Sequence, residues 1–239
     1  MTQEDGTVKK RQLGDYILTF LIINVFYITI LFCCDRFIKS DTGFLSYLKN
    51  PKAWSIAYIV VVFFTMKLTN DLEVQKHGDR LDPLWLTIHP MGLVLLPVVF
   101  ILNFTPWEKE LKRPFEETIG DPIIRLMGYG GAIKPFLEKL NLAQVSEEGE
   151  NNLSQEMEKD IQEKIKKVVS RKLTLDDIDG GDTDKPYKSI WDSAYNENDT
   201  NERKAKSLIK FKRYISEFIW ITLASLIVSN ITMLSLVNA

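Results

Sequence analysis

Residues 218–237 read FIWITLASLIVSNITMLSLV, and residues 84–104 read LWLTIHPMGLVLLPVVFILNF. Neither stretch contains Asp, Glu, Lys or Arg. A helix rises about 1.5 Å per residue, so about 20 apolar residues cross the hydrocarbon core of a bilayer, which is about 30 Å thick. Both stretches have this length, and each therefore predicts a transmembrane helix.

Two further apolar stretches come earlier in the chain, at Tyr16–Cys34 and Ala53–Leu68. The second of these is short, but Lys52 and Lys67 flank it, and their long side chains can extend to the headgroups. The sequence thus predicts an all-α, polytopic membrane protein with about four transmembrane helices. An interfacial amphipathic segment and a cytoplasmic helix complete the predicted fold.

Charge is segregated along the chain, which carries a formal net charge of −2. Most of its Lys, Arg, Asp and Glu residues lie between Thr105 and Glu217. We therefore expect a polar tail (1–15), a three-span membrane region (16–104), an interfacial amphipathic segment (105–142), a charged helical and linker region (143–217) and a C-terminal transmembrane helix (218–239).

Positive charge near the span ends predicts the orientation, because basic loops resist translocation. The excess of Lys and Arg on the side of the 105–217 block places that block in the cytoplasm and both termini across the membrane. Sequons at Asn152 and Asn198 argue for the opposite orientation, because glycosylation requires a lumenal position. The basic cluster ahead of the last span predicts contact with anionic lipid through Lys204, Lys206, Lys210, Lys212 and Arg213.

The spans contain few polar residues that could carry a function. His89 is ionisable and precedes Pro90 near one end of the third span, so it is either a functional group or a partner for nearby backbone and headgroups. Asn230 lies inside the last span, where its amide needs a partner, within the protein or on a second subunit. Cys33 and Cys34 end the first span, where they either pack as small apolar residues or accept palmitate.

The charged block reads as three parts. Between Trp107 and Leu142, two short apolar-faced segments flank the glycines at 128–131, which is typical of an interfacial element. Residues 153–173 predict a soluble helix whose apolar stripe, with Ile161 and Ile165, packs on its own domain or on a partner helix. Residues 174–202 are acidic and predict a solvated linker, with docking of the aromatic side chains Tyr187, Trp191 and Tyr195.

Several functional classes are disfavoured by missing motifs. Two histidines and two adjacent cysteines do not provide zinc spacing or a multi-histidine iron site. Hydrolase, nucleotide-binding and metalloprotease motifs do not occur, and no motif of a known family can be quoted. We expect no catalytic residue, cofactor or metal, and no nucleic-acid partner.

These patterns favour a non-enzymatic accessory or scaffold subunit of the endoplasmic reticulum membrane, with protein partners in that membrane and a role in lipid or sterol biosynthesis. One alternative is a membrane-protein biogenesis factor that chaperones polytopic clients through Asn230. A second alternative is a lipid-modifying enzyme that uses His89.

Overall fold

The computed structural model describes residues 3–37, 50–77, 82–147, 173, 178, 187–195 and 199–237. Every regular element in these ranges is helical. In chain order the elements are α1 (Gln3–Phe37), α3 (Pro51–His77), α4 (Pro83–Pro90), η1 (Met91–Leu95), α5 (Leu96–Phe104), α6 (Glu108–Phe115), η2 (Glu116–Gly120), α7 (Asp121–Leu126), α8 (Tyr129–Glu147), α11 (Lys188–Ala194) and α12 (Thr200–Val237).

Among the described residues, four helical segments are long and apolar enough to cross a membrane: Gly14–Cys34, Lys52–Gln75, Pro83–Phe104 and Thr200–Leu236. The prediction of an all-helical protein with four candidate transmembrane helices is thereby confirmed. The second segment is longer than its apolar run of 16 residues indicated, because α3 continues through Thr69–Gln75. At about 1.5 Å per residue, its 24 residues reach about 36 Å, so its length suffices for a full crossing.

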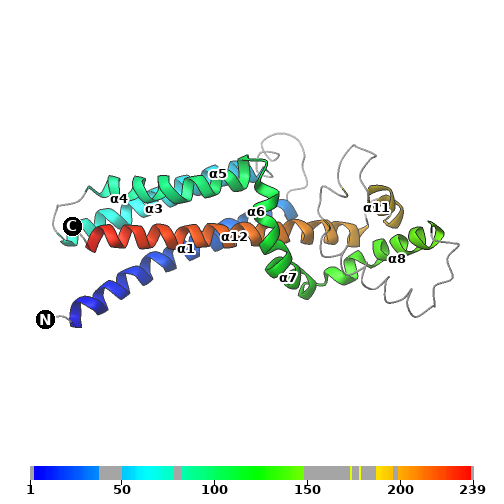
Figure 1. Ribbon diagram of the computed structural model, residues 1–239, viewed down its shortest axis with the longest axis horizontal. Coiled ribbons are helices and arrows are strands. Elements are labelled where there is room, and N and C mark those ends of the chain that lie inside the picture. The colour runs from blue at the N-terminus through cyan, green and yellow to red at the C-terminus, as the bar shows by residue number, and fades with distance from the viewer. Residues whose placement is uncertain are drawn as a thin grey trace. The chain divides into compact units, whose positions relative to one another are not determined.

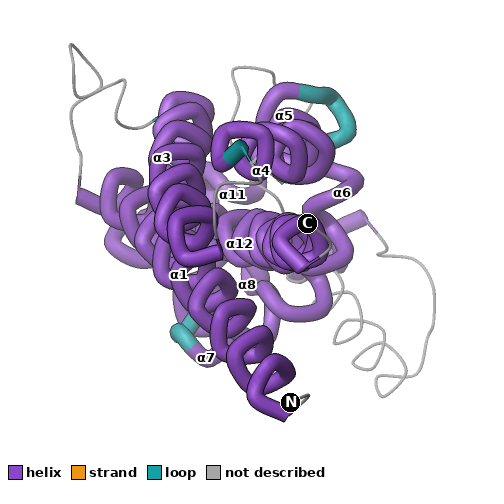
Figure 2. The backbone as a smooth tube through the Cα atoms, turned by 90° about the vertical axis from the view of Figure 1, so that its left-hand side faces the viewer, coloured by secondary structure: helices purple, strands orange, loops and turns teal. Residues whose placement is uncertain are grey.

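The helices form two compact units: residues 1–113 with 214–239, and residues 114–213. In the first unit, α1, α3, the α4–η1–α5 helix and the second half of α12 gather into one bundle (Figures 1 and 2). The start of α1 and the end of α12 lie at the same end of this bundle (Figure 1), as an even number of crossings requires. Its apolar core contains Phe20, Val62, Leu95, Leu102 and Val228, each almost fully buried.

The third candidate span is one long helix with a wider turn in its middle. Asp82 caps its start, since the side-chain carboxylate accepts the Leu84 N–H at 2.9 Å. Pro90 and Pro97 then bracket η1, where the Leu96 N–H donates to the carbonyl of Met91, five residues earlier. A proline ring clashes with the carbonyl four residues before it, so this wider π turn provides the space the ring needs.

The same arrangement recurs after the span. Pro114 and Pro122 bracket η2, and the Asp121 N–H donates to the carbonyl of Glu116. Pro122 lies in the first turn of α7. Helical structure consequently runs without a break from α6 through η2 into α7.

The second unit has an aromatic core of its own. Trp191 is fully buried, with its ring centroid 5.2 Å from that of Phe136 and 4.7 Å from that of Tyr195. The Tyr195 hydroxyl donates to the Ala132 carbonyl at 2.7 Å. Docking of the aromatic residues was correctly predicted, but this region, which we read as a solvated linker, also contributes Ile178 to the core.

Candidate functional site: a buried ion pair in the first unit

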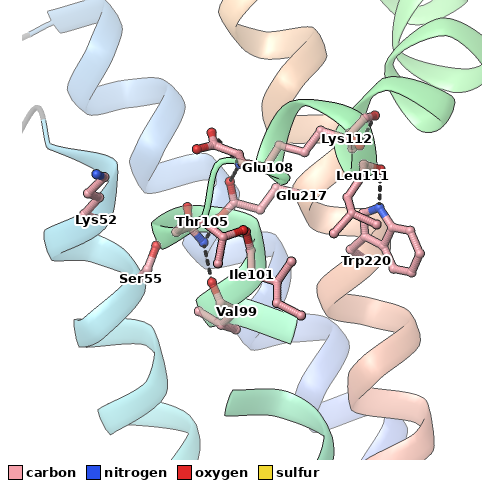
Figure 3. A network of polar contacts seen from close by, with 12 residues as sticks. Lys52, Ser55, Val99, Ile101, Thr105, Glu108, Leu111, Lys112, Glu217 and Trp220 are labelled. Carbon is pink, nitrogen blue, oxygen red and sulfur yellow. Dashed lines mark hydrogen bonds and ion pairs between the residues drawn. The ribbon is translucent and has the colours of Figure 1, made fainter. Parts of the chain in front are cut away.

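An ion pair is enclosed in the first unit, at the level where α5 ends and α6 begins. Lys112 Nζ lies 2.9 Å from Glu217 Oε2, and the two side chains are only 2% and 1% exposed. Lys112 also lies 3.5 Å from Glu108, one helical turn earlier on α6. Figure 3 shows these side chains converging from α6 and α12. Removing both charges from water is costly, so the pair needs further hydrogen bonds.

Glu217 receives those hydrogen bonds from two other helices. Its Oε1 accepts the Tyr27 hydroxyl of α1 at 2.7 Å and the Asn103 amide of α5 at 3.3 Å. Tyr27 in turn lies 3.0 Å from the Ser55 hydroxyl of α3. One carboxylate is thus connected, directly or through Tyr27, to every helix of the bundle.

Two side-chain bonds to backbone fix α6 against α12 beside the ion pair. The Ser216 hydroxyl donates to the Lys112 carbonyl at 2.6 Å, and the Trp220 indole N–H donates to the Leu111 carbonyl at 2.7 Å (Figure 3). Both carbonyls lie on the short helix α6, so the two side-chain donors hold this helix beside α12. The position of the Lys112 backbone is consequently set independently of its charge.

Two further polar networks join helices at other levels of the bundle. Asn24 donates its amide N–H groups toward Thr222 and Ser225 and accepts the Tyr58 hydroxyl at 2.7 Å. At another level, the Tyr16 hydroxyl donates to Asn70 at 2.6 Å, and Asn70 donates to Thr87 at 2.9 Å. In each network the buried groups satisfy one another, which is how polar side chains persist in a membrane interior.

Neither Lys112 nor Glu217 was singled out from the sequence, and Glu217 was missed because it immediately precedes the last apolar run. A signal was available in α6. Glu108, Leu111, Lys112 and Phe115 follow the spacing of one helical face. A lysine that shares a helix face with Leu111 and Phe115 next to a membrane span indicates a buried partner of opposite charge.

The residues that the sequence did nominate are dispersed. His89 is exposed, with its ring stacked on Trp85 at 5.2 Å between centroids. Asn230 is exposed and donates back to the Leu226 carbonyl of its own helix at 2.8 Å. Cys33 and Cys34 are free thiols of intermediate exposure. Ile161, Ile165 and both sequon asparagines lie outside the described residues.

The basic cluster on α12 does not present its charges uniformly. Lys212 is 3% exposed and packs against Gly120, so its nomination as a lipid contact is corrected by its burial. Lys206 pairs with Glu202 at 2.9 Å. Lys204 is exposed, whereas Lys206, Lys210 and Arg213 are half-buried, and the expected contact of these four with anionic lipid stays a prediction.

Within the described parts of the chain, no group of three His, Cys, Asp or Glu residues could hold a metal ion. The fold and the enclosed polar network define a class: a multi-pass integral membrane protein whose bundle is joined by buried polar contacts. A scan against protein-family models finds no match, and comparisons with curated proteins and with solved structures find no similar chain.

Proposed function

We propose that this protein is a non-enzymatic accessory or scaffold subunit that binds another membrane protein through the outward face of α12. The observation that carries the proposal is Asn230. Its side chain is exposed in the apolar part of the helix, and its one hydrogen bond among the described residues returns to its own backbone. A primary amide has two N–H donors and two acceptor lone pairs, so most of its capacity is free for a neighbouring helix.

The residues around Asn230 suit a helix interface. Leu223, Ile227 and Leu234 are 41%, 51% and 60% exposed and lie on the same side of α12 as Asn230. Together with Asn230 these residues are spaced at intervals of four, three and four, as in the contact stripe of packed helix pairs. An amide within such a stripe adds a hydrogen bond that lipid cannot supply, worth about 1 kcal/mol.

The buried ion pair supports a structural role for the polar interior. Glu217 and Lys112 are almost fully enclosed, and the carboxylate is engaged by three side chains from three helices. A group held in this way stabilises one arrangement of the bundle, which a subunit that positions a partner requires. Residence in the endoplasmic reticulum and support of lipid or sterol biosynthesis complete the proposal, because small multi-span proteins without catalytic motifs commonly serve such pathways.

We further propose that residues 105–142 include the expected interfacial amphipathic segment, which the exposed apolar residues in and beside α7 support. Ile119, Ile123, Leu126 and Met127 share one helix face and are all exposed, Leu126 to 89%. Apolar side chains in that arrangement favour contact with the headgroup region. Arg125, half-exposed among them, pairs with Asp121 at 2.8 Å.

Asn230→Leu tests the proposal in the full-length, tagged protein purified in digitonin. The expected result is loss of a stoichiometric partner, identified by mass spectrometry, with unchanged protein abundance. Thr29→Val is the matched control, since Thr29 is also an exposed polar residue in a candidate span and bonds only back to its own helix, at Val25. If the Asn230→Leu variant retains every partner, the outward face of α12 is not the binding interface.

A membrane-protein biogenesis factor is the second candidate, because an exposed amide in a span can also engage clients transiently. The same purification separates the two functions. A scaffold retains one stable partner set, whereas a chaperone retains a broad spread of newly made membrane proteins that disappears when translation is stopped.

A further inference from the structure

A groove of about 450 Å³ opens on the outer surface of the bundle, between α3 and the η1–α5 helix. It is lined by Ile59, Gly92, Leu96, Pro97, Phe100 and Phe104. All six lie in candidate membrane spans, so the medium that faces the groove is lipid. Its volume is within the range of small-molecule binding sites in proteins.

The groove has the length of one lipid leaflet. Its lining on η1–α5 runs from Gly92, at the middle of the third span, to Phe104, the last residue of α5. Twelve residues at about 1.5 Å each give about 18 Å, and half of a hydrocarbon core of about 30 Å is about 15 Å. An acyl chain anchored at the Phe104 end would therefore end near Gly92.

A positive charge is placed at the Phe104 end. Lys52 lies in the first turn of α3 and is exposed, and its ammonium is 5.9 Å from the centre of the Phe104 ring. Figure 3 shows Lys52 at this end of α3. Because α3 begins where α5 ends, the cation lies where the phosphate of a lipid would be if the chain of that lipid filled the groove.

Gly92, which has no side chain, leaves the inner end of the groove open. A Cβ atom built on Gly92 has no heavy atom within 4 Å, so nothing in the protein fills the space beside it. Leu96 and Phe100 follow at intervals of four residues and are 41% and 58% exposed, forming the apolar wall. The length of the groove, its apolar lining and the charge of Lys52 at one end therefore all favour the same kind of occupant, a lipid.

We propose that this groove binds one anionic glycerophospholipid, with an acyl chain along Phe104, Phe100 and Gly92 and the phosphate beside Lys52. The proposal is independent of the partner-binding face on α12, which uses different residues. One basic side chain at a membrane surface corresponds to roughly a fivefold preference for an anionic over a zwitterionic lipid.

The test is native mass spectrometry of the full-length protein in detergent micelles that contain equal amounts of phosphatidylserine and phosphatidylcholine with identical acyl chains. The wild-type protein is expected to retain one phosphatidylserine with about fivefold preference. Lys52→Gln should retain both lipids equally, because the groove remains while the charge is gone. Gly92→Leu should retain neither, because its side chain occupies the groove.

Two controls separate the site from general lipid contact and from misfolding. Lys67→Gln removes an exposed lysine at another level of α3, and Gly14→Leu adds a side chain to α1 at a glycine with equally open surroundings. Both should behave as wild type, and all variants are compared by circular dichroism. Equal retention of the two lipids by the wild-type protein would overturn the proposal, as would unchanged phosphatidylserine retention in Gly92→Leu.

Discussion

Breaking the Lys112–Glu217 pair from one side only should destabilise the bundle far more than removing both charges. Lys112→Met leaves a carboxylate that is 1% exposed with only Tyr27 and Asn103 as donors. Glu217→Gln leaves a buried ammonium with Glu108 at 3.5 Å as its remaining counter-charge. Removal of one partner from a buried pair costs about 3–5 kcal/mol.

The double variant is expected to recover most of that loss. An apolar or neutral replacement of both members of a buried pair is often close to neutral, because neither desolvated charge remains. If the two substitutions were independent, their costs would sum to about 6–10 kcal/mol. We expect the double variant to lie within about 3 kcal/mol of wild type, which gives a coupling energy of several kcal/mol.

The assay is reversible unfolding in mixed micelles with increasing dodecyl sulfate, followed by circular dichroism. Lys67 and Asp71 provide the control pair, since their charged atoms are similarly close, at 2.7 Å, but the side chains are 37% and 30% exposed. Exposed pairs couple by less than about 1 kcal/mol. Additive costs at Lys112 and Glu217, or coupling no larger than in the control pair, would refute the assignment of the two residues as a buried ion pair on which the bundle depends.

Four further predictions concern other described residues. The Tyr129 hydroxyl is buried without a hydrogen-bond partner among the described residues, so Tyr129→Phe should leave the free energy of unfolding unchanged or raise it. The Tyr195 hydroxyl donates to the Ala132 carbonyl, so Tyr195→Phe should lower the free energy of unfolding by about 1 kcal/mol. Urea titration of both variants measures these changes. Burial raises the pKa of Tyr129 above its usual value, so stability is fully present below about pH 10 and should fall above it, less steeply in Tyr129→Phe. A Cβ on Gly120 would lie 2.6 Å from the Cγ and 3.1 Å from the backbone oxygen of Lys212 on α12, so Gly120→Ala should lower the free energy of unfolding by about 1–3 kcal/mol. Gly130 has open space around it, so Gly130→Ala should not have this effect. Thermal melts in which the two variants are equally stable would contradict this. His89→Ala should keep partners and abundance and leave any lipid product unchanged, as lipid analysis of cells would show; loss of a product at constant abundance would favour an enzyme.

The spans could be predicted from the sequence because a bilayer requires a long apolar run, and such runs are visible residue by residue. The end of α3 could not, since Thr69–Gln75 is polar and continues the helix through contacts such as that of Asn70 with Thr87. The composition of the sequence also gave no indication of the aromatic core of the second unit. Trp191 lies in an acidic stretch, and its burial depends on Phe136, which is distant in the chain.

The candidate site was invisible to motif reasoning for a physical reason. Lys112 and Glu217 are 105 residues apart, and each alone resembles an ordinary charged residue beside a span. Asn103 and Tyr27 look equally ordinary. Only packing brings the four side chains together, and a burial pattern within α6 was the single local hint.

The π turn at η1 also sets the rotational phase of everything that follows it in the third span. A π turn holds one residue more than an α turn, and each residue of an α-helix rotates the chain by about 100°. If residues 91–95 formed a regular α turn instead, with no residue removed, the rest of the span would rotate by about that angle. Asn103 would then point away from Glu217, and the Phe100–Phe104 stripe would leave the side facing Ile59. A single inserted residue, held in place by two prolines, therefore aligns both the enclosed carboxylate contact and the lipid-facing groove.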